Sequence, residues 1–189
     1  MNAQAPRLPR IDVAYEDELL GSWFARIAKR HDGPWQQVLE WSGYTPQKWT
    51  HPDIRLPEDR FIKLLSILNT SYIEVLTQRT TWPYWAALNA SDKMIEVEGR
   101  SLPLLRPFGR KPPTLKTKTR DGKYWFCPLC WREDAAKAID PYWRRSHQLP
   151  SAFVCCKHKC MLVSDCDNCG RQPITNRESN LPGPGICGC

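Results

Sequence analysis

The sequence predicts a mainly α-helical fold with small β elements, and two observations support this prediction. In the first half of the chain, apolar residues recur at the three- and four-residue spacing of helices. In the second half, between residues 126 and 189, lie all nine cysteines of the 189-residue chain. Grouped cysteine pairs are typical of zinc ribbons. We therefore expect an N-terminal helical domain, resembling a helix-turn-helix unit, followed by two structural zinc modules.

Changes in composition divide the chain into five parts. Residues 1–15 are rich in proline and are expected to be disordered, and residues 16–99 hold the helical domain. Residues 100–123 form a basic linker that contains several prolines. The first zinc finger spans residues 124–165, and the second zinc ribbon spans residues 166–189. Because the second ribbon would end on a metal ligand, we expect it to be truncated and the chain to be part of a longer protein.

Four short helices are expected in the helical domain. Residues 16–31 form the first, since acidic residues lead it and basic residues end it. Its apolar face consists of Leu19, Leu20, Trp23, Phe24, Ile27 and Ala28. The second helix covers residues 35–42, and the third begins at Pro57. Ser71 and Glu74 have the spacing of a capping box, which predicts the start of the fourth.

The third and fourth helices are separated only by Asn69 and Thr70. Together they could form a helix-turn-helix that places residues 71–79 in a groove of DNA. An ordinary helix pair is the alternative. It is favoured because the second helix has few outward polar side chains that could read bases, with Gln78 and Arg79 at its end.

Positive charge is concentrated in the second half. The formal net charge is +7, but residues 1–99 hold 11 Lys and Arg against 13 Asp and Glu, whereas residues 100–189 hold 16 against 7. A basic, extended linker suits contact with DNA phosphates, since such contact needs no rigid geometry. A solvated linker is the alternative. The candidate DNA-binding residues are Arg106, Arg110, Lys111, Lys116, Lys118, Arg120 and Lys123.

Eight residues are candidate metal ligands. A Cys-x-x-Cys pair presents two sulfurs to one ion, and soft ligands of this kind select zinc. The first set is Cys127, Cys130, Cys155 and His158, although Cys156 or Cys160 could replace Cys155. Otherwise Cys156 and Cys160 are expected to be small buried hydrophobic residues. The second set is Cys166, Cys169, Cys187 and Cys189. Two structural zinc ions are therefore expected.

Disulfides and a catalytic metal are both disfavoured. No segment has the apolar length of a signal peptide or a membrane helix, so we expect a cytoplasmic protein in which thiols stay reduced. Each set of four ligands fills a zinc shell and leaves no open position for water. The nearby acids are expected in ordinary surface positions, and they are Glu133, Asp134, Asp165 and Asp167. We therefore predict that the protein is not an enzyme.

Seven segments form an ordered pattern along the chain. They are DELLGSWFAR (Asp17–Arg26), FCPLCW (Phe126–Trp131), YWRR (Tyr142–Arg145), Leu149-Pro150, Val154–His158, Cys166–Gly170 and Cys187–Cys189. In order and spacing they resemble the TniQ family of transposon target-selection proteins, which includes TnsD. An unrelated zinc ribbon would lack the first of these segments and the Tyr-Trp-Arg segment. Where the family usually has Pro-x-His-Gly, this chain has Cys156–Lys159.

The resemblance implies a non-catalytic protein that recruits an AAA+ transposition regulator, of the TniB or TnsC type, to double-stranded target DNA. In CRISPR-associated relatives it implies contact with the guide-RNA effector complex as well. A homodimer is a further expected assembly, and no membrane partner is expected. The regulator-facing surface would lie in the N-terminal half, with Glu16, Asp17 and Arg26 on its solvent side. The competing class is a transcription-factor-like zinc ribbon that binds DNA without an ATPase partner.

Overall fold

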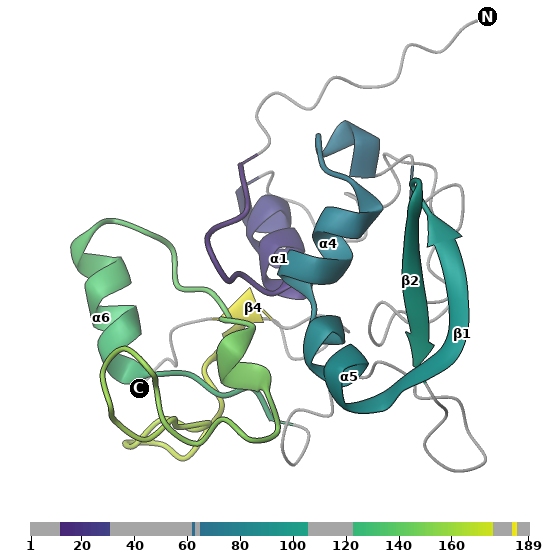
Figure 1. Ribbon diagram of the computed structural model, residues 1–189. Helices are drawn as coiled ribbons and strands as arrows, with labels where there is room; N and C mark the ends of the chain where they lie inside the picture. Colours follow the sequence, from purple (N-terminus) through teal and green to yellow (C-terminus); the bar gives the residue numbers. More distant parts are fainter. Residues whose placement is uncertain (1–11, 31–61, 63–64, 106–122, 176–182, 185–189) are drawn as a thin grey trace, which may run out of the picture.

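A computed structural model describes residues 12–30, 62, 65–105, 123–175 and 183–184. The elements in chain order are α1 (Leu20–Arg30), α4 (Tyr72–Arg79), α5 (Trp82–Asn89), β1 (Ala90–Val97), β2 (Arg100–Leu105), α6 (Pro128–Ala136), η2 (Ser146–Gln148), β3 (Ile174–Thr175) and β4 (Gly183–Pro184). The elements from α1 to β2 form a helical half with a hairpin at its outer side. The later elements form a cysteine half, which lies on the other side of α1 (Figure 1).

Helix α1 begins at Leu20, later than the predicted residue 16, because Asp17 has a left-handed conformation with φ of 56°. A non-glycine residue with positive φ cannot continue a right-handed helix. The predicted apolar face is confirmed from Leu20 onward, since Trp23, Phe24 and Ile27 are also buried. These side chains form the core of the helical half. Its other members are Leu65, Leu68, Tyr72, Ile73, Val75, Leu76, Trp82 and Val97.

A hydroxyl group and a carboxylate group cap the start of α4. The predicted N-cap of this helix is confirmed, because the Ser71 hydroxyl accepts a hydrogen bond from the amide of Glu74 at 3.0 Å. The Glu98 carboxylate accepts two more, from the amides of Tyr72 and Ile73 at 2.9 and 3.1 Å. Negative charge at this end of a helix is favourable, so Glu98 ties the hairpin to α4.

The turn before α4 follows the predicted helix pair. Residues 65–67 are helical, and Asn69 turns the chain with a positive φ of 52°. At the end of α4, Gln78 is exposed, but Arg79 donates a hydrogen bond to the carbonyl of Tyr15. One of the two polar side chains at the end of α4, Arg79, is thus engaged within the protein. Recognition of DNA bases by this helix stays a prediction. The predicted second helix lies outside the described residues.

Residues 82–105 form a helix and a hairpin that were not predicted from the sequence. Pro83 lies in the first turn of α5, where an amide proton would lack a helical partner in any case. β1 and β2 pair antiparallel, with Glu98 and Gly99 in the turn at φ values of 48° and 73°. Residues 100–105 are therefore a strand, and the expectation that the basic linker starts at residue 100 is wrong.

The two halves meet where residues 17–19 contact residues 143–146, a contact that we call the joint. The amide of Arg145 donates to the carbonyl of Asp17 at 2.7 Å. The Asp17 carboxylate in turn accepts from the amide of Ser146 at 3.1 Å and from its hydroxyl. The predicted helical and zinc-binding parts are thus joined directly, as well as through the chain between them.

Aromatic packing extends the joint on the cysteine side. Leu19 donates its amide proton to the carbonyl of Trp143 at 2.8 Å, and the indole of Trp143 is fully buried. Tyr124 stacks on Trp143 with ring centroids 5.0 Å apart, and Phe126 stacks on Trp131 at 4.0 Å. Such pairs contribute more than the area that they bury, so this cluster is the second core of the protein.

Candidate metal centre

Three sulfur atoms and one ring nitrogen converge beside α6. The Sγ atoms of Cys127, Cys130 and Cys155 and the Nδ1 atom of His158 all lie within 4.8 Å of one another. His158 Nδ1 is 3.4, 3.3 and 3.7 Å from these three sulfurs, and Cys130 Sγ is 3.7 Å from Cys155 Sγ. Zinc bonds of about 2.0 to 2.3 Å in a tetrahedron place such donors roughly 3.5 to 3.8 Å apart. The four donors therefore have the spacing of a zinc shell.

Burial of the sulfurs also suits a metal. Cys127, Cys130 and Cys155 are at most 3 % exposed. Burial raises the pKa of the Cys130 thiol, and the nearby Arg144 guanidinium only partly opposes that rise. A divalent cation would supply the positive charge that keeps buried thiolates ionised. Because four donors complete a tetrahedron, the arrangement fits a structural ion and not a hydrolytic one.

The start of α6 positions the first ligand pair. Cys127 is the N-cap of the helix, and its Sγ accepts a hydrogen bond from the amide of Cys130 at 3.4 Å. Pro128 follows at the first helical position, where its fixed φ favours the turn. Phe126 and Val163 exchange two backbone hydrogen bonds of 2.9 Å. This bridge brings the second ligand pair, which precedes Val163 in the chain, beside the first.

A tight turn positions the second ligand pair. The amide of Lys159 donates to the carbonyl of Cys155, and the amide of Cys155 donates to the carbonyl of Cys160, both at 2.8 Å. Lys159 has a φ of 55°. We call this turn, residues 155–160, the first knuckle. It directs Cys155 and His158 to the same side.

Glu133 holds the outer side of His158. Its carboxylate lies 2.8 Å from His158 Nε2 and also pairs with Lys157. The hydrogen bonds from Lys157 and then from His158 lower the pKa of Glu133 to about 2, so the carboxylate is ionised at neutral pH. An imidazole that donates from Nε2 to this carboxylate keeps Nδ1 free to bind metal. The expectation of an ordinary surface position for Glu133 is therefore wrong.

The sequence does contain a signal for Glu133. It follows Cys130 by three residues in a helix, a spacing that places two side chains on one helical face. Asp134 also differs from its expected surface position, because it is buried and its carboxylate pairs with Arg144 at 2.8 Å. Asp167 is exposed, as predicted.

Of the three candidates for the third ligand, the structure places Cys155 in the cluster and neither Cys156 nor Cys160. The Cys155 sulfur is buried within the cluster, whereas Cys156 is exposed and outside it. The expectation that Cys156 is a small buried residue is wrong. Cys160 is half-buried, and its Sγ lies 3.4 Å from that of Cys127.

The second predicted ligand set is described only in part. Its first pair is Cys166 and Cys169, and its second pair, Cys187 and Cys189, lies outside the described residues. The amide of Gly170 donates to the carbonyl of Cys166, and the amide of Cys166 donates to that of Arg171, both at 2.8 Å. Gly170 has a φ of 65°. Residues 166–171, the second knuckle, thus repeat the backbone bonds and the left-handed position of the first knuckle.

The predicted DNA-binding residues fall almost entirely outside the described part. Arg106, Arg110, Lys111, Lys116, Lys118 and Arg120 lie there. Lys123 is described, and its ammonium pairs with Asp165 at 2.6 Å on the surface. Any phosphate contact by Lys123 would therefore compete with this carboxylate.

The predicted partner surface needs a correction. Arg26 is only 5 % exposed and binds the fully buried Glu18 through two hydrogen bonds, of 2.7 and 3.2 Å. The expectation that Arg26 lies on the solvent side is wrong, because it belongs to a buried ion pair. The carboxylate of Asp17 is engaged in the joint, and Glu16 alone of the three is exposed.

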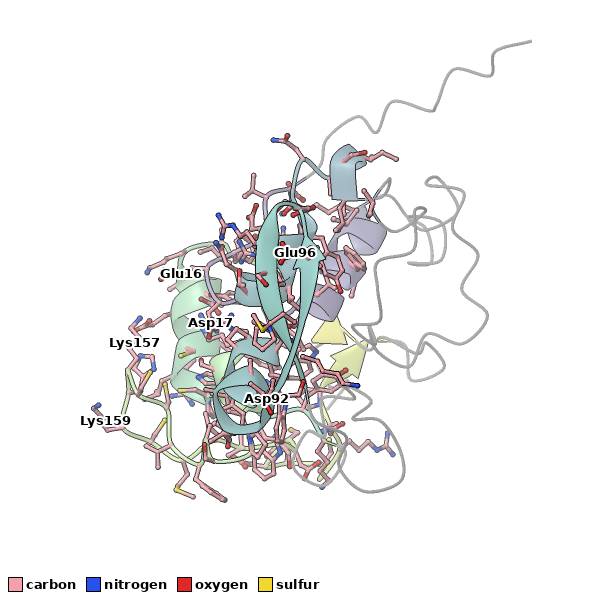
Figure 2. All side chains as sticks on the ribbon, turned by 45° about the vertical axis from the view of Figure 1, so that its right-hand side comes forward. Glu16, Asp17, Asp92, Glu96, Lys157 and Lys159 are labelled. Carbon is pink, nitrogen blue, oxygen red and sulfur yellow. The ribbon has the colours of Figure 1, made fainter. Side chains whose placement is uncertain are left out.

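Figure 2 shows charged side chains on both halves of the surface, and the hairpin itself carries both signs, since Lys93 and Arg100 are also exposed there. Asp92 and Glu96 lie along the hairpin, and Lys157 and Lys159 lie at the outer edge of the cysteine half. None of the described helices has the length and apolar character needed to span a bilayer.

A comparison with known protein families gives a match that spans the joint and the metal centre. Residues 9–162 match the family model TniQ. No curated protein matches the chain in sequence. The matched range contains α1, both sides of the joint and all four residues of the metal centre, and it covers well over half of the chain. The chain therefore belongs to the TniQ family.

Proposed function

We propose that the protein is a non-catalytic adaptor of DNA transposition in the bacterial cytoplasm, which recruits an AAA+ regulator of the TniB or TnsC type to target DNA. Its TniQ membership associates it with transposition and target selection. The observation that best supports an adaptor is the joint. An adaptor has to hold two partners in a fixed relation, and the backbone and carboxylate hydrogen bonds of Asp17 fix the helical half against the cysteine half.

Two structural zinc ions belong to this proposal. The first would bind Cys127, Cys130, Cys155 and His158, whose spacing fits a tetrahedral shell. The second would bind Cys166, Cys169, Cys187 and Cys189. The likeness of the two knuckles supports the second ion, because a turn that directs two ligands to one side serves the same purpose in both places. Metal analysis of the purified chain tests the stoichiometry, and a value near one would remove the second ion.

We propose that DNA and the regulator bind to different surfaces of the protein. DNA phosphates would meet the basic residues between 106 and 123, and the regulator would meet the helical half around Glu16. Residues 1–99 hold 11 Lys and Arg against 13 Asp and Glu, so this half is a poorer surface for phosphate than the basic residues between 106 and 123.

A pull-down of the AAA+ regulator with ATP and DNA tests the adaptor role. Glu16→Lys should weaken recruitment while leaving metal content unchanged, because an isolated surface charge contributes little to stability. Glu96→Lys is the matched control, since it reverses another exposed acid, on the hairpin. Equal loss in both variants would point to a general charge effect.

A tight DNA footprint with no regulator bound under any condition would favour the transcription-factor-like alternative. Replacing the regulator with a guide-RNA effector tests a CRISPR-linked role.

The salt dependence of DNA binding tests the basic linker separately. Each phosphate contact contributes a slope of about −0.9 to the plot of log affinity against log salt concentration. Neutralising Lys116, Lys118 and Arg120 together should flatten that slope by the contribution of up to about three phosphate contacts. An unchanged slope would mean that the linker is simply solvated.

A further inference from the structure

The first knuckle holds a fifth metal-binding side chain beside the four donors of the centre. Cys160 Sγ lies 3.4 Å from Cys127 Sγ, closer than the 3.7 Å between the sulfurs of Cys130 and Cys155. We propose that Cys160 is a reserve ligand, which takes the position of His158 when the histidine leaves and completes a shell of four thiolates. This inference rests on the proposed occupancy of the centre by a metal ion.

His158 is the donor that is easiest to replace. The three cysteine ligands are buried, whereas the His158 side chain is 13 % exposed and is held from outside by Glu133, which is 40 % exposed. A ligand supported by a solvated carboxylate can be released without opening the buried side of the centre.

Cys160 is placed so that an exchange leaves the knuckle intact. It follows His158 by two residues in the same turn, and its own carbonyl accepts the amide of Cys155 at 2.8 Å. Its backbone is therefore fixed relative to a ligand that stays. The exchange asks of Cys160 a rotation of its side chain, with no break in the hydrogen bonds that close the turn. In the second knuckle the equivalent position is Arg171, so this thiol is a feature of the first knuckle.

The chemistry of the exchange is balanced by the surroundings. Zinc accepts three cysteines with one histidine and four cysteines with the same tetrahedral geometry. Replacing a neutral imidazole by a thiolate adds one negative charge to the shell and releases the thiol proton to solvent. Lys157 and Lys159 flank His158 and are exposed. Lys157 already pairs with Glu133, so Lys159 is the nearer candidate to offset that charge.

The experiment compares variants of the full chain loaded with ¹¹³Cd²⁺ under reducing conditions. Cadmium NMR gives one resonance for each site, and its position reports the number of thiolate ligands. In His158→Ala the resonance of the first site should move to the position of a four-thiolate shell. Because Cys160 keeps the shell at four donors, only the outer-shell support that Glu133 gives through His158 is lost, and metal affinity should fall by no more than about 100-fold. In His158→Ala combined with Cys160→Ser that resonance should vanish, with a far larger loss of affinity.

Two controls make the result decisive. Cys160→Ser alone should keep the wild-type resonance, which shows that serine is tolerated there. His158→Ala combined with Cys156→Ser should match His158→Ala, because the exposed Cys156 lies outside the cluster. The inference is overturned if His158→Ala loses its metal, or if adding Cys160→Ser changes nothing. Failure of the wild-type chain to bind any ion at this site would instead refute the proposed metal centre.

Discussion

Removing the Glu18 carboxylate should destabilise the protein by about 3 kcal/mol, because the buried Arg26 guanidinium would lose its nearest counter-charge and keep only the more distant Asp12, at 3.7 Å. Glu18 is fully buried and accepts three hydrogen bonds, two from Arg26 and one from the amide of Tyr15 at 2.9 Å. Breaking a buried pair by removing one partner costs about 3 to 5 kcal/mol. Arg26 keeps a hydrogen bond of 2.9 Å to the carbonyl of Val13 and lies 3.9 Å from the centre of the Tyr15 ring. These remaining contacts place the expected loss at the lower end of that range.

Urea and thermal unfolding of the metal-saturated chain measure this effect. For a protein of this size, about 3 kcal/mol corresponds to a decrease in Tm of roughly 6 to 12 °C in Glu18→Ala. Glu16→Ala is the control, because this neighbouring acid is exposed and should change the free energy of unfolding by less than about 0.5 kcal/mol. Replacing the pair by Glu18→Leu with Arg26→Met should cost less than Glu18→Ala alone, since no unpaired charge is left buried. A loss below about 1 kcal/mol in Glu18→Ala would refute the reasoning.

Three further predictions concern the metal centre and pH. Cys130→Ser should lose metal and folding stability, whereas Cys156→Ser should leave both unchanged by metal analysis and circular dichroism, because only Cys130 lies in the cluster. Equal damage would mean that the wrong thiol was chosen. Glu133→Gln should weaken zinc affinity by about 10- to 100-fold in a chelator competition, since it loosens the orientation of His158; unchanged affinity would make the contact incidental. Burial, and then the charge of a neighbouring arginine, lower the pKa of His147 to about 4. The unfolded chain therefore binds a proton that the folded chain excludes, and stability should fall by up to about 3 kcal/mol from pH 6.5 to pH 4. That fall should be smaller in His147→Gln, and an identical pH profile would contradict it.

The features that the sequence predicts well are local ones. Cys127 and Cys130 share one turn, as do Cys155 and His158, so ligand spacing favoured the four donors that the structure brings together, with Cys156 and Cys160 left as alternatives to Cys155. The N-cap at Ser71 is local in the same sense. In each case a few neighbouring residues decide the backbone conformation, and no distant contact is needed to recognise it.

The features that the sequence missed depend on contacts between distant segments. The hairpin of β1 and β2 is held through Glu98, whose carboxylate caps α4 from 25 and 26 residues away. The burial of Arg26 depends on Glu18, which points inward because Asp17 turns the chain just before it. From helical periodicity alone, Arg26 is an outward charge. Glu18 can be recognised as the partner of Arg26 only when α1 is known to begin at Leu20.

The joint changes how the TniQ resemblance should be used in experiments. The segments Asp17–Arg26 and Tyr142–Arg145 carry much of that resemblance, and the structure uses them on each other: the Arg145 amide bonds to Asp17, and the Trp143 amide bonds to the hydroxyl of Ser22 at 3.0 Å. Substitutions in these segments would therefore impair recruitment by loosening the two halves, whether or not the segments touch a partner. A partner surface can be mapped only with side chains that are exposed and make no such contact. Glu16 meets that condition in the helical half, and Asp17 and Arg26 do not.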